Sequence, residues 1–376
     1  VDGPVTGLDA PPPSQASTVR GVILLCFAAL LTLAIIPRPL SVLTTAHGCC
    51  AVYLGLCVGI DFAIRHASAA NGGSFPLNPA TSVLVVEACK LVISGVHSAF
   101  HMWSTKRARG EVLVPDRADA ALFIVPGLVH TANNIITFTA ASSVPLVALN
   151  TIHETTLLWY ALLWTAVFGV AFSLRRWFSL AGACVGGVMV HVSTRFEYEL
   201  EWTIVWPFVL AFLGACGGVA TEYALKRTRA VDLSLQNSIL FAFSTLFSVV
   251  FFFAFRRAVL EEFLGGFQAE CAKVLVLQVV AGLVVNNIFK HMDSVTKAVT
   301  VCLRGPAVLI LEVAASHPRD FGSSEFTALL VVCLGCASYL REGPIRSEAS
   351  QTLPRTKGSR FRPHRQRPAG GGAAKA

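Results

Sequence analysis

The chain of 376 residues is hydrophobic at 54% of its positions and charged at only 14%, with a net charge of +8 and a mean hydropathy of +0.63. Soluble domains carry about a quarter charged residues, so this deficit excludes a disordered chain, a nucleic-acid-binding protein and most soluble enzymes. Much of the excess Lys and Arg lies in residues 341–376, and basic charge near membrane spans reports orientation rather than a ligand. The composition favours an integral membrane protein.

Long apolar segments recur along the chain. A membrane-spanning helix needs about 20 apolar residues, and these segments are continuous runs rather than the alternating patterns of β-strands. We therefore predict an all-α polytopic membrane protein with spans at about 20–37, 47–65, 80–100, 119–141, 144–171, 177–193, 203–225, 236–255, 273–290, 296–316 and 326–340.

The segment at 20–37 stands apart from the ten that follow. No Lys or Arg precedes Arg20, which argues against the basic region of a signal peptide. We expect an added helix within an N-terminal extension of residues 1–46, with a cleaved signal peptide as the alternative. Residues 341–376 are rich in Pro, Gly, Ser and Arg, which predicts a disordered basic tail.

The charges of the loops alternate along the chain. Every second loop is basic, and the loops between are acidic or mixed; the basic set is Lys106, Arg107, Arg109, Arg117, Arg175, Arg176, Lys226, Arg227, Arg229 and Lys290. Positively charged loops stay on the cytosolic side of a membrane. We therefore expect ten core helices between 47 and 340 that begin and end in the cytosol, with a cytosolic C-terminus.

Ionisable residues also lie inside the apolar segments, where a charge is costly and usually faces a partner or a cavity. Glu87 and Lys90 are three residues apart, and Glu222 and Lys226 are four apart, so each couple can pair on one helix face. We interpret the first couple as a pair that positions a helix. We interpret the second as a surface pair at the cytosolic end of a span. Both interpretations give these residues structural or gating roles.

Two cations occupy the last span but one. Lys297 and Arg304 are seven residues apart, which places them on nearly the same helix face, and unpaired cations there predict an anionic ligand. A structural ion pair of Arg304 with Glu154 or Glu312 is the alternative. Pro306 predicts a kink in the helix beside this site.

Amide side chains form a further polar group within the spans. Asn133 and Asn134 are adjacent in the segment at 119–141, and Asn237 lies near the start of the segment at 236–255. Each amide offers donors and an acceptor, which suits nucleobase edges and ribose hydroxyls. Hydrogen bonds between neighbouring helices are the other use of such amides.

No catalytic or metal-binding pattern accompanies these residues. The sequence has no Gly-x-Ser-x-Gly, no His-Glu-x-x-His and no phosphate-binding Gly-rich loop. His153 and Glu154 are adjacent and therefore point to different faces of a helix. Cys333 and Cys336 have no His or second Cys pair near them. We predict no enzyme activity, no metal and no cofactor.

Several motifs, in matching order and spacing, resemble those of the nucleotide-sugar transporters of the drug/metabolite transporter superfamily. The resemblance is narrowest to the branch that carries UDP-galactose, UDP-N-acetylglucosamine and CMP-sialic acid, and it covers about 47–340. The motifs are Glu87-Ala-Cys-Lys90, Pro126 with Asn133-Asn134, Val219-Ala-Thr-Glu222-Tyr-Ala-Leu-Lys226, Leu235-Gln-Asn237, and Gly282-Leu followed by Lys290-His-Met-Asp293-Ser-Val-Thr-Lys297.

The resemblance implies roles for four of the polar residues. Asn133 or Asn134, together with Asn237, would contact the nucleotide, and Lys297 would contact the phosphate-bearing part of the substrate.

The chain also departs from the family's pattern. Thr155 stands where the family has a Lys in its fourth helix, and Phe241 stands where it has a Tyr. Arg304 lies in the ninth helix, where the family has small or apolar residues. We hypothesise that Arg304 replaces the missing cation, and that His153 or Glu154 reads a sugar or a base.

The two halves, 47–193 and 203–340, each hold five predicted helices. An odd number per half gives opposite orientations, as in transporters with inverted repeats, and the family's fold has the same arrangement. We predict a central cavity that opens alternately to the cytosol and the lumen, with Lys290 and Asp293 as structural or gating groups at its cytosolic mouth. A cytosolic nucleotide sugar, UDP- or CMP-linked, would exchange there for a lumenal nucleoside monophosphate.

The resemblance implies a Golgi or endoplasmic reticulum membrane and allows a homodimer; we expect no nucleic-acid partner. Three alternatives stay open. The chain could belong to another drug/metabolite transporter group for phosphorylated metabolites, or be a transport-inactive relative that scaffolds glycosyltransferases. A membrane-bound enzyme would need a His/Asp or His/Ser pair near one interface, and none is found in the sequence.

Overall fold

The computed structural model describes residues 46–71, 75, 77–109, 114–143, 152–192, 205–255, 267, 269–315 and 323–342. Within these ranges the regular elements are all α-helices. The span predicted at 20–37 and almost all of the basic tail lie outside the described residues, so both stay predictions.

The helices correspond to the ten core spans expected from the sequence. They are α2 (Ala46–Ala70), α3 (Pro79–Arg109), α4 (Arg117–Ala121), α5 (Ile124–Ser143), α7 (Thr156–Phe168), α8 (Leu174–Val192), α9 (Val205–Arg227), α10 (Leu233–Phe255), α12 (Ala269–His291), α13 (Ser294–Cys302), α14 (Arg304–Ala315) and α15 (Ser323–Arg341). Within the described part of the chain, six stretches are long and apolar enough to cross a membrane. The chain is therefore an all-α polytopic membrane protein.

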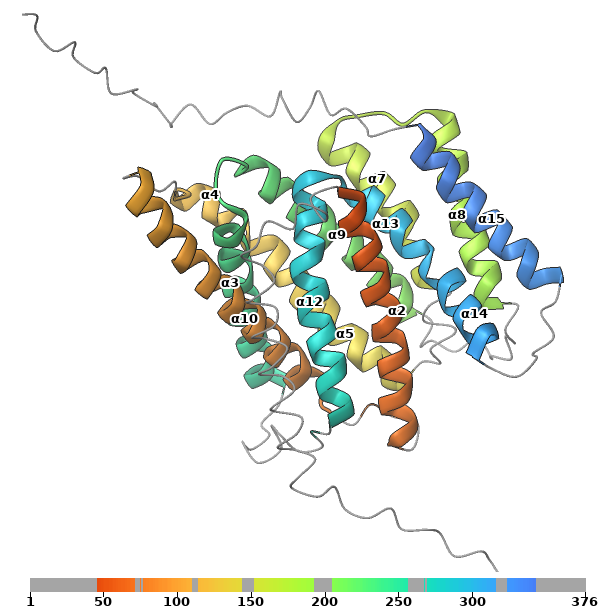
Figure 1. The fold of residues 1–376 in the computed structure, drawn as a ribbon, viewed down its shortest axis with the longest axis horizontal. Coiled ribbons are helices and arrows are strands. Elements are labelled where there is room, and N and C mark those ends of the chain that lie inside the picture. The colour runs from red at the N-terminus through yellow and green to blue at the C-terminus, as the bar shows by residue number, and fades with distance from the viewer. Residues whose placement is uncertain are drawn as a thin grey trace, which may run out of the picture.

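The helices pack as a bundle whose two flanks are pairs of helices far apart in the sequence (Figure 1). α3 packs along α10 on one flank and α8 along α15 on the other, while α2 contacts α12 and α5 contacts α9 between them. The contacts keep this pattern when the first five helical segments are exchanged, in order, for the last five. The first five are α2, α3, α4–α5, α7 and α8, and the last five are α9, α10, α12, α13–α14 and α15. The α2–α12 contact then becomes the α9–α5 contact, and each flanking pair maps onto itself.

The flank of α8 and α15 depends on close approach of the two backbones. A Cβ at Gly186 of α8 would lie 2.6 Å from the backbone N of Val332, and a Cβ at Gly335 of α15 would lie 2.5 Å from the backbone N of Ala183. Small residues are the usual means of helix contact in lipid, because burial there gives no hydrophobic gain between helices. Larger residues at these two positions would separate the helices.

Two spans that contain a proline are each divided into two helices. The turn at 122–123 separates α4 from α5, and Leu303 separates α13 from α14. Pro126 and Pro306 are the third residues of α5 and α14. A proline has no N–H for the carbonyl four residues back, but it is tolerated in a first helical turn, where these N–H groups have no helical partner. The interruption beside Pro306 falls directly before Arg304, and the kink expected there stays a prediction.

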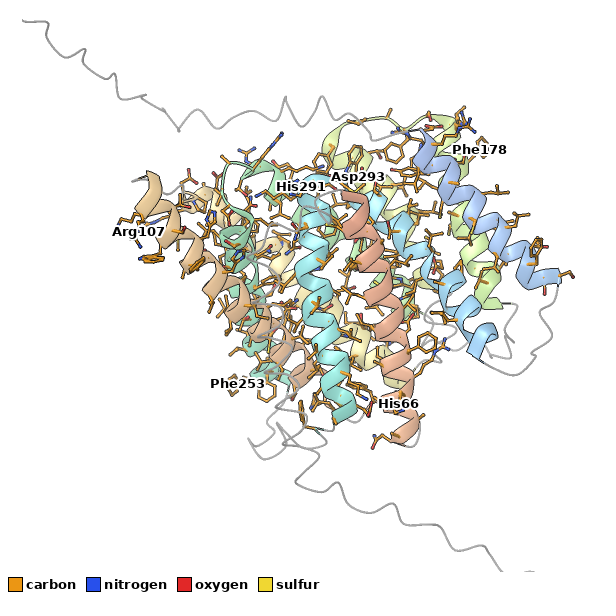
Figure 2. The ribbon with its side chains drawn as sticks, viewed as in Figure 1. His66, Arg107, Phe178, Phe253, His291 and Asp293 are labelled. Atoms are coloured by element: carbon orange, nitrogen blue, oxygen red, sulfur yellow. The ribbon has the colours of Figure 1, made fainter. Side chains whose placement is uncertain are left out.

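The helix ends differ in charge between the two sides of the bundle. The last turns of α9, α12 and α15 all carry basic residues. Figure 2 shows Arg107 of α3, His291 of α12 and Asp293 on this side, with His66 and Phe253 on the opposite side. The side that holds the C-termini of α3, α9 and α12 is called the basic end below.

Candidate functional site

One lysine inside the bundle lies between two tyrosines. The Nζ of Lys297 on α13 is 3.5 Å from the hydroxyl of Tyr160 on α7. The same Nζ is 5.3 Å from the centre of the Tyr160 ring and 5.7 Å from the centre of the Tyr53 ring on α2. Ring faces attract a cation and a phenol oxygen accepts a hydrogen bond from it, so three helices together stabilise a charged Lys297.

Lys297 has no counter-ion among the residues that the structure describes. No carboxylate there forms an ion pair with its Nζ, whereas Lys90 and Lys226 each contact a carboxylate oxygen at 2.5 Å. A cation inside a membrane protein usually pairs or marks the path of a charged ligand. Lys297 therefore has no acidic partner among the described residues, and its role in binding an anion stays a prediction.

The position of the Tyr160 side chain is fixed by contacts with α9. Its hydroxyl donates to the Gly214 carbonyl at 3.0 Å, and a Cβ at Gly218 would overlap the Tyr160 side chain. Because the single hydroxyl proton goes to Gly214, the oxygen lone pairs are left to accept from Lys297. Asn133 of α5 also approaches Gly214, and within the described residues its buried Oδ1 has no hydrogen-bond partner.

The second predicted cation, Arg304, is paired with an acid on α2. Its Nε lies 3.4 Å from Oδ2 of Asp61, and the two side chains are only 14% and 11% exposed. Asp61 was missing from the partners considered on the sequence, Glu154 and Glu312. A single carboxylate inside the apolar run of 47–65 was the signal that could have revealed it. The Glu312 side chain lies outside the described residues.

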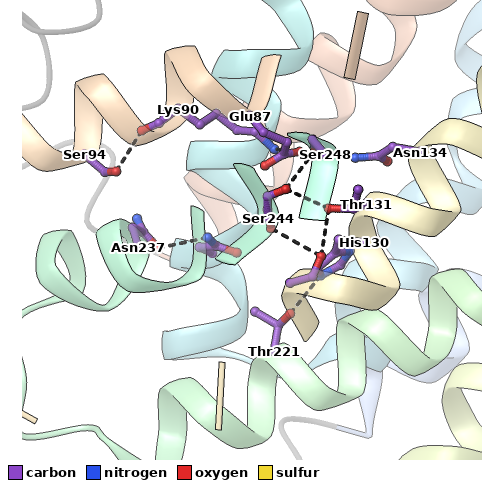
Figure 3. A network of polar contacts seen from close by, with 12 residues as sticks. Glu87, Lys90, Ser94, His130, Thr131, Asn134, Thr221, Asn237, Ser244 and Ser248 are labelled. Carbon is purple, nitrogen blue, oxygen red and sulfur yellow. Dashed lines mark hydrogen bonds and ion pairs between the residues drawn. The ribbon is translucent and has the colours of Figure 1, made fainter. Parts of the chain in front are cut away.

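The predicted Glu87–Lys90 pair is present, and it forms part of a polar network (Figure 3). Lys90 Nζ lies 2.5 Å from Glu87 Oε1, and Asn134 of α5 donates to the same oxygen at 3.3 Å. The Lys90 ammonium also lies 4.8 Å from the centre of the Phe241 ring on α10. The charge of Lys90 is thus neutralised inside its own helix, and Asn134 hydrogen-bonds a neighbouring helix.

Two further hydrogen bonds connect the helices of this network. His130 Nε2 of α5 lies 2.8 Å from the Thr221 hydroxyl of α9. Asn286 of α12 donates to the Oδ1 of Asn237 on α10 at 2.8 Å. Asn237, which the resemblance assigns to the nucleotide, therefore already uses its amide oxygen to join α10 and α12.

Glu222 joins three helices near the basic end. Its carboxylate accepts hydrogen bonds from Lys226 Nζ at 2.5 Å, from Trp164 Nε1 at 3.1 Å and from the Ser294 N–H at 2.7 Å. The Glu222–Lys226 pair exists as expected, but the interpretation as a surface pair was wrong, because Glu222 is 0% exposed. Sequence spacing gives the pair, whereas the burial comes from α7 and α13, which pack over it.

Lys290 and Asp293 hold the helix ends at the basic end. Asp293 is the N-cap of α13, and its side chain accepts the Thr296 N–H at 2.6 Å. Lys290 donates to the Val231 carbonyl at 3.0 Å and to Gln236 Oε1 at 2.9 Å. These contacts connect α12, α13 and the turn before α10.

His153 and Glu154 lie directly before α7, with Glu154 in the turn that leads into it. His153 is half-buried and Glu154 is buried. A Cβ at Gly187 of α8 would lie 2.9 Å from Glu154 Oε2, so this carboxylate packs against α8. Thr155, at the position of the family's lysine, donates its hydroxyl to the Ile152 carbonyl at 2.7 Å.

Sequence reasoning missed the two tyrosines beside Lys297. The chain has 25 Phe and only 5 Tyr, so a Tyr inside an apolar segment is unusual in this sequence. A buried Tyr needs a partner for its hydroxyl, which makes Tyr53 and Tyr160 candidates for polar contacts. Among the described residues, no group of three or more His, Cys, Asp and Glu side chains is arranged to hold a metal ion.

Comparison with known families identifies the chain. The model of the nucleotide-sugar transporter family matches residues 57–339. The chain belongs to this family. The match runs from α2 to α15 and includes Tyr160, Lys297 and Arg304. The family is one of transporters rather than enzymes.

The chain is also similar to individual proteins at low identity. CMP-sialic acid transporter 2 of Oryza sativa subsp. indica is 19% identical over 233 residues, which cover 60% of this chain and 65% of the rice protein. The probable UDP-sugar transporter protein SLC35A4 of Xenopus tropicalis is 22% identical over 235 residues, which cover 60% of this chain and 71% of that protein. The chain thus matches just under two thirds of the length of the rice relative.

A solved structure described as "Crystal structure of protein" has the same fold. It superposes with a TM-score of 0.55 at 15% sequence identity, covering 80% of this chain and 98% of the other. The similarity extends over most of the bundle and concerns the fold alone.

Proposed function

We propose that this nucleotide-sugar transporter family member is an antiporter that exchanges a cytosolic nucleotide sugar for a lumenal nucleoside monophosphate by alternating access. The observation that carries the proposal is Lys297, a cation that Tyr53 and Tyr160 hold inside the bundle with no carboxylate partner among the described residues. Both exchanged ligands carry phosphate, and both would bind at the same ammonium group.

Further polar residues are proposed to read the rest of the ligand. The Asn133 amide oxygen is buried next to Gly214, which in turn binds Tyr160, so Asn133 is well placed to read a base or ribose beside Lys297. Asn134 and Asn237 retain a proposed role in nucleotide contact. His153 and Glu154 are proposed to read the sugar or base from the start of α7.

Other charged residues are proposed to support or gate the pathway. The buried Glu222 carboxylate connects α7, α9 and α13 near the basic end, and Asp293 caps the first turn of the helix that carries Lys297. A change in these contacts would move the Lys297 helix relative to α9. Glu87, Lys90 and Lys290 are proposed to have structural or gating roles of the same kind.

The contact pattern of the bundle favours alternating access between two inverted halves, 47–193 and 203–340, and the charge of its ends favours one orientation. Helix contacts keep their pattern when the halves are exchanged, which is expected of repeated units that rock against each other. The basic end would face the cytosol by the positive-inside rule, which also makes the C-terminus cytosolic. The family suggests a Golgi or endoplasmic reticulum membrane, with a homodimer as a possible assembly.

Counterflow in proteoliposomes tests this function. Vesicles loaded with UMP or CMP and containing the purified full chain are offered radiolabelled UDP-sugars and CMP-sugars. We expect accumulation of at least one class, and a reduction of about tenfold or more in Lys297→Gln, because a lost charged hydrogen bond is worth about 1.5–3 kcal/mol. Lys273→Gln is the matched control, since Lys273 is 53% exposed and pairs with Glu270.

Other outcomes would favour the competing functions. Exchange of sugar phosphates alone would indicate a carrier of phosphorylated metabolites. Lack of exchange with every nucleotide sugar, in a protein that still binds its partners, would indicate a scaffold. Equal exchange by wild type and Lys297→Gln would contradict the proposed role of this lysine.

A further inference from the structure

Two rows of side chains face each other between α2 and the α13–α14 segment. Tyr53, Cys57 and Asp61 follow at intervals of four residues on α2, which places them on one helix face. Lys297 and Arg304 lie two turns apart on the facing segment. Lys297 meets Tyr53 at one end of the row, and Arg304 meets Asp61 at the other.

The two cations differ in their counter-charge. Lys297 has none among the described residues, and Arg304 contacts Asp61. Cys57 lies one helical turn from Tyr53 and one from Asp61, on the face of α2 where both contacts are made. The two positive groups therefore belong to one continuous strip along α2.

The contact between Arg304 and Asp61 is a loose one. The Nε–Oδ2 distance is 3.4 Å, whereas charge-assisted N–H···O bonds are usually about 2.7–2.9 Å. A phosphate carries more negative charge than a carboxylate and matches the planar guanidinium donors in two-point contacts. A phosphate delivered next to Arg304 therefore has the means to take the place of Asp61.

We propose that the Asp61–Arg304 pair is a second phosphate subsite, in which the Asp61 carboxylate occupies the position of a ligand's distal phosphate while the carrier is empty. The inference rests on the proposed function, and it names the substrate class. A ligand with one phosphate engages Lys297 only. A ligand with two phosphates engages Lys297 and displaces Asp61 from Arg304, so nucleoside diphosphate-sugars bind in preference to sugars linked through a single phosphate.

The pair also has a use in release. When a ligand with two phosphates leaves, the Asp61 carboxylate returns to Arg304 and restores the ion pair. Breaking a buried ion pair is unfavourable, so the return of the Asp61 carboxylate stabilises the empty carrier between two transport steps.

Nucleotide binding to the purified full chain in detergent tests the subsite, with UMP and UDP as the two probes. In wild type we expect UDP to bind more tightly than UMP. Asp61→Asn removes the competing carboxylate, so UDP affinity should rise by about tenfold while UMP affinity changes by less than about twofold. Glu270→Gln is the matched control: it neutralises an acid that pairs with Lys273 at 2.8 Å and with His66 at 3.3 Å, and it should change neither affinity.

A second variant covers the case in which Asp61→Asn does not fold. The double variant Asp61→Asn/Arg304→Gln removes both charges of this pair together, a change that buried ion pairs often tolerate. It should bind UMP like wild type and lose the preference for UDP. A double variant that keeps the UDP preference would overturn the subsite, as would an Asp61→Asn variant that shifts UMP and UDP equally. Wild-type protein that binds neither nucleotide would overturn the proposed function together with the subsite.

Discussion

Lys90 and Lys297 are two lysines in apolar helices of the same bundle with opposite surroundings. Both lie close to aromatic rings, Lys90 at 4.8 Å from the centre of Phe241 and Lys297 at 5.3 Å from the centre of Tyr160. Lys90 also has the Glu87 carboxylate at 2.5 Å, whereas Lys297 has, within the described residues, the Tyr160 hydroxyl at 3.5 Å. An aromatic ring therefore accompanies both kinds of lysine, and the carboxylate distinguishes them.

The local sequence explains this difference. Glu87 stands three residues before Lys90 and reaches its ammonium along the same helix face. Asp293 stands four residues before Lys297, at a spacing that would also allow a pair. Its carboxylate instead accepts the Thr296 N–H and caps α13. An acid used as a helix cap leaves the following lysine without that carboxylate, which is the difference on which the proposed role of Lys297 rests.

The largest effect is expected when the charge of Lys90 is removed. Lys90→Gln leaves Glu87 in a site that is 1% exposed, and loss of one partner of a buried pair is worth about 3–5 kcal/mol of stability. Lys297→Gln has no such consequence, because no carboxylate among the described residues depends on Lys297. Unfolding midpoints of the two variants in detergent measure the contrast.

Equal losses of stability in Lys90→Gln and Lys297→Gln would contradict the difference between the two lysines. The double variant Glu87→Gln/Lys90→Gln serves as the control, since it leaves no charge unpaired and should recover most of the loss. A double variant as unstable as Lys90→Gln would show that the packing around Gly282, across which the Lys90 side chain lies, matters more than the charge.

An intermediate effect is expected at Gly218, which leaves space for the tyrosine beside Lys297. A Cβ at this position overlaps Tyr160, so Gly218→Ala should lower stability by about 1–3 kcal/mol and also weaken nucleotide binding by moving the Tyr160 hydroxyl away from Lys297. Gly182→Ala of α8 is the control, because a Cβ there has no atom within 4 Å and alanine favours a helix. Thermal unfolding and UMP titration measure the two consequences. Unchanged binding in a destabilised Gly218→Ala protein would separate Tyr160 from the ligand site.

Much of the fold could be predicted from the sequence because it depends on local properties. Continuous apolar runs give the positions of ten helices, and Pro306 gives the break before Arg304. In the span expected at 144–171, α7 ends at Phe168, three residues before the predicted end, while residues 144–151 lie outside the described part and their placement stays a prediction. The length of an apolar run therefore locates a helix but does not fix where it ends.

The site could be predicted only in part, because its partners are distant in the sequence. Spacing places Lys297 and Arg304 on one face, yet it does not indicate that Asp61, more than two hundred residues earlier, meets Arg304. The Tyr160 contact likewise depends on how α7 packs against α9 and α13. Local pairs such as Glu87–Lys90 are visible in a sequence, whereas contacts between helices need the packed bundle.

The smallest effect on stability is expected for a carboxylate outside the membrane spans. It shows how much smaller the contribution of a solvated helix cap is than that of a buried charge pair. Asp232 precedes α10, and its side chain accepts the Ser234 N–H at 2.8 Å as an N-cap. Burial alone would raise the pKa of the Asp232 carboxyl, but hydrogen bonds from the Ser234 hydroxyl and N–H outweigh it and hold the pKa below its ordinary value. Asp232→Ala should therefore lower stability by about 1 kcal/mol at neutral pH, and Asp232→Asn should retain most of the cap.

The pH dependence of this effect follows from the lowered pKa of Asp232. A carboxyl whose pKa is depressed by folding contributes stability that is fully present above its unfolded pKa of about 3.9, and the contribution is lost as the pH falls through the folded value. Unfolding midpoints of wild type and Asp232→Ala should converge at acidic pH. A gap that stays constant with pH would mean that packing of the side chain, rather than its charge, stabilises the start of α10. The stability lost in Asp232→Ala should also remain well below that lost in Lys90→Gln. Water can hydrogen-bond the N–H groups at the start of α10, whereas no water replaces Lys90 beside Glu87 in the interior of the bundle.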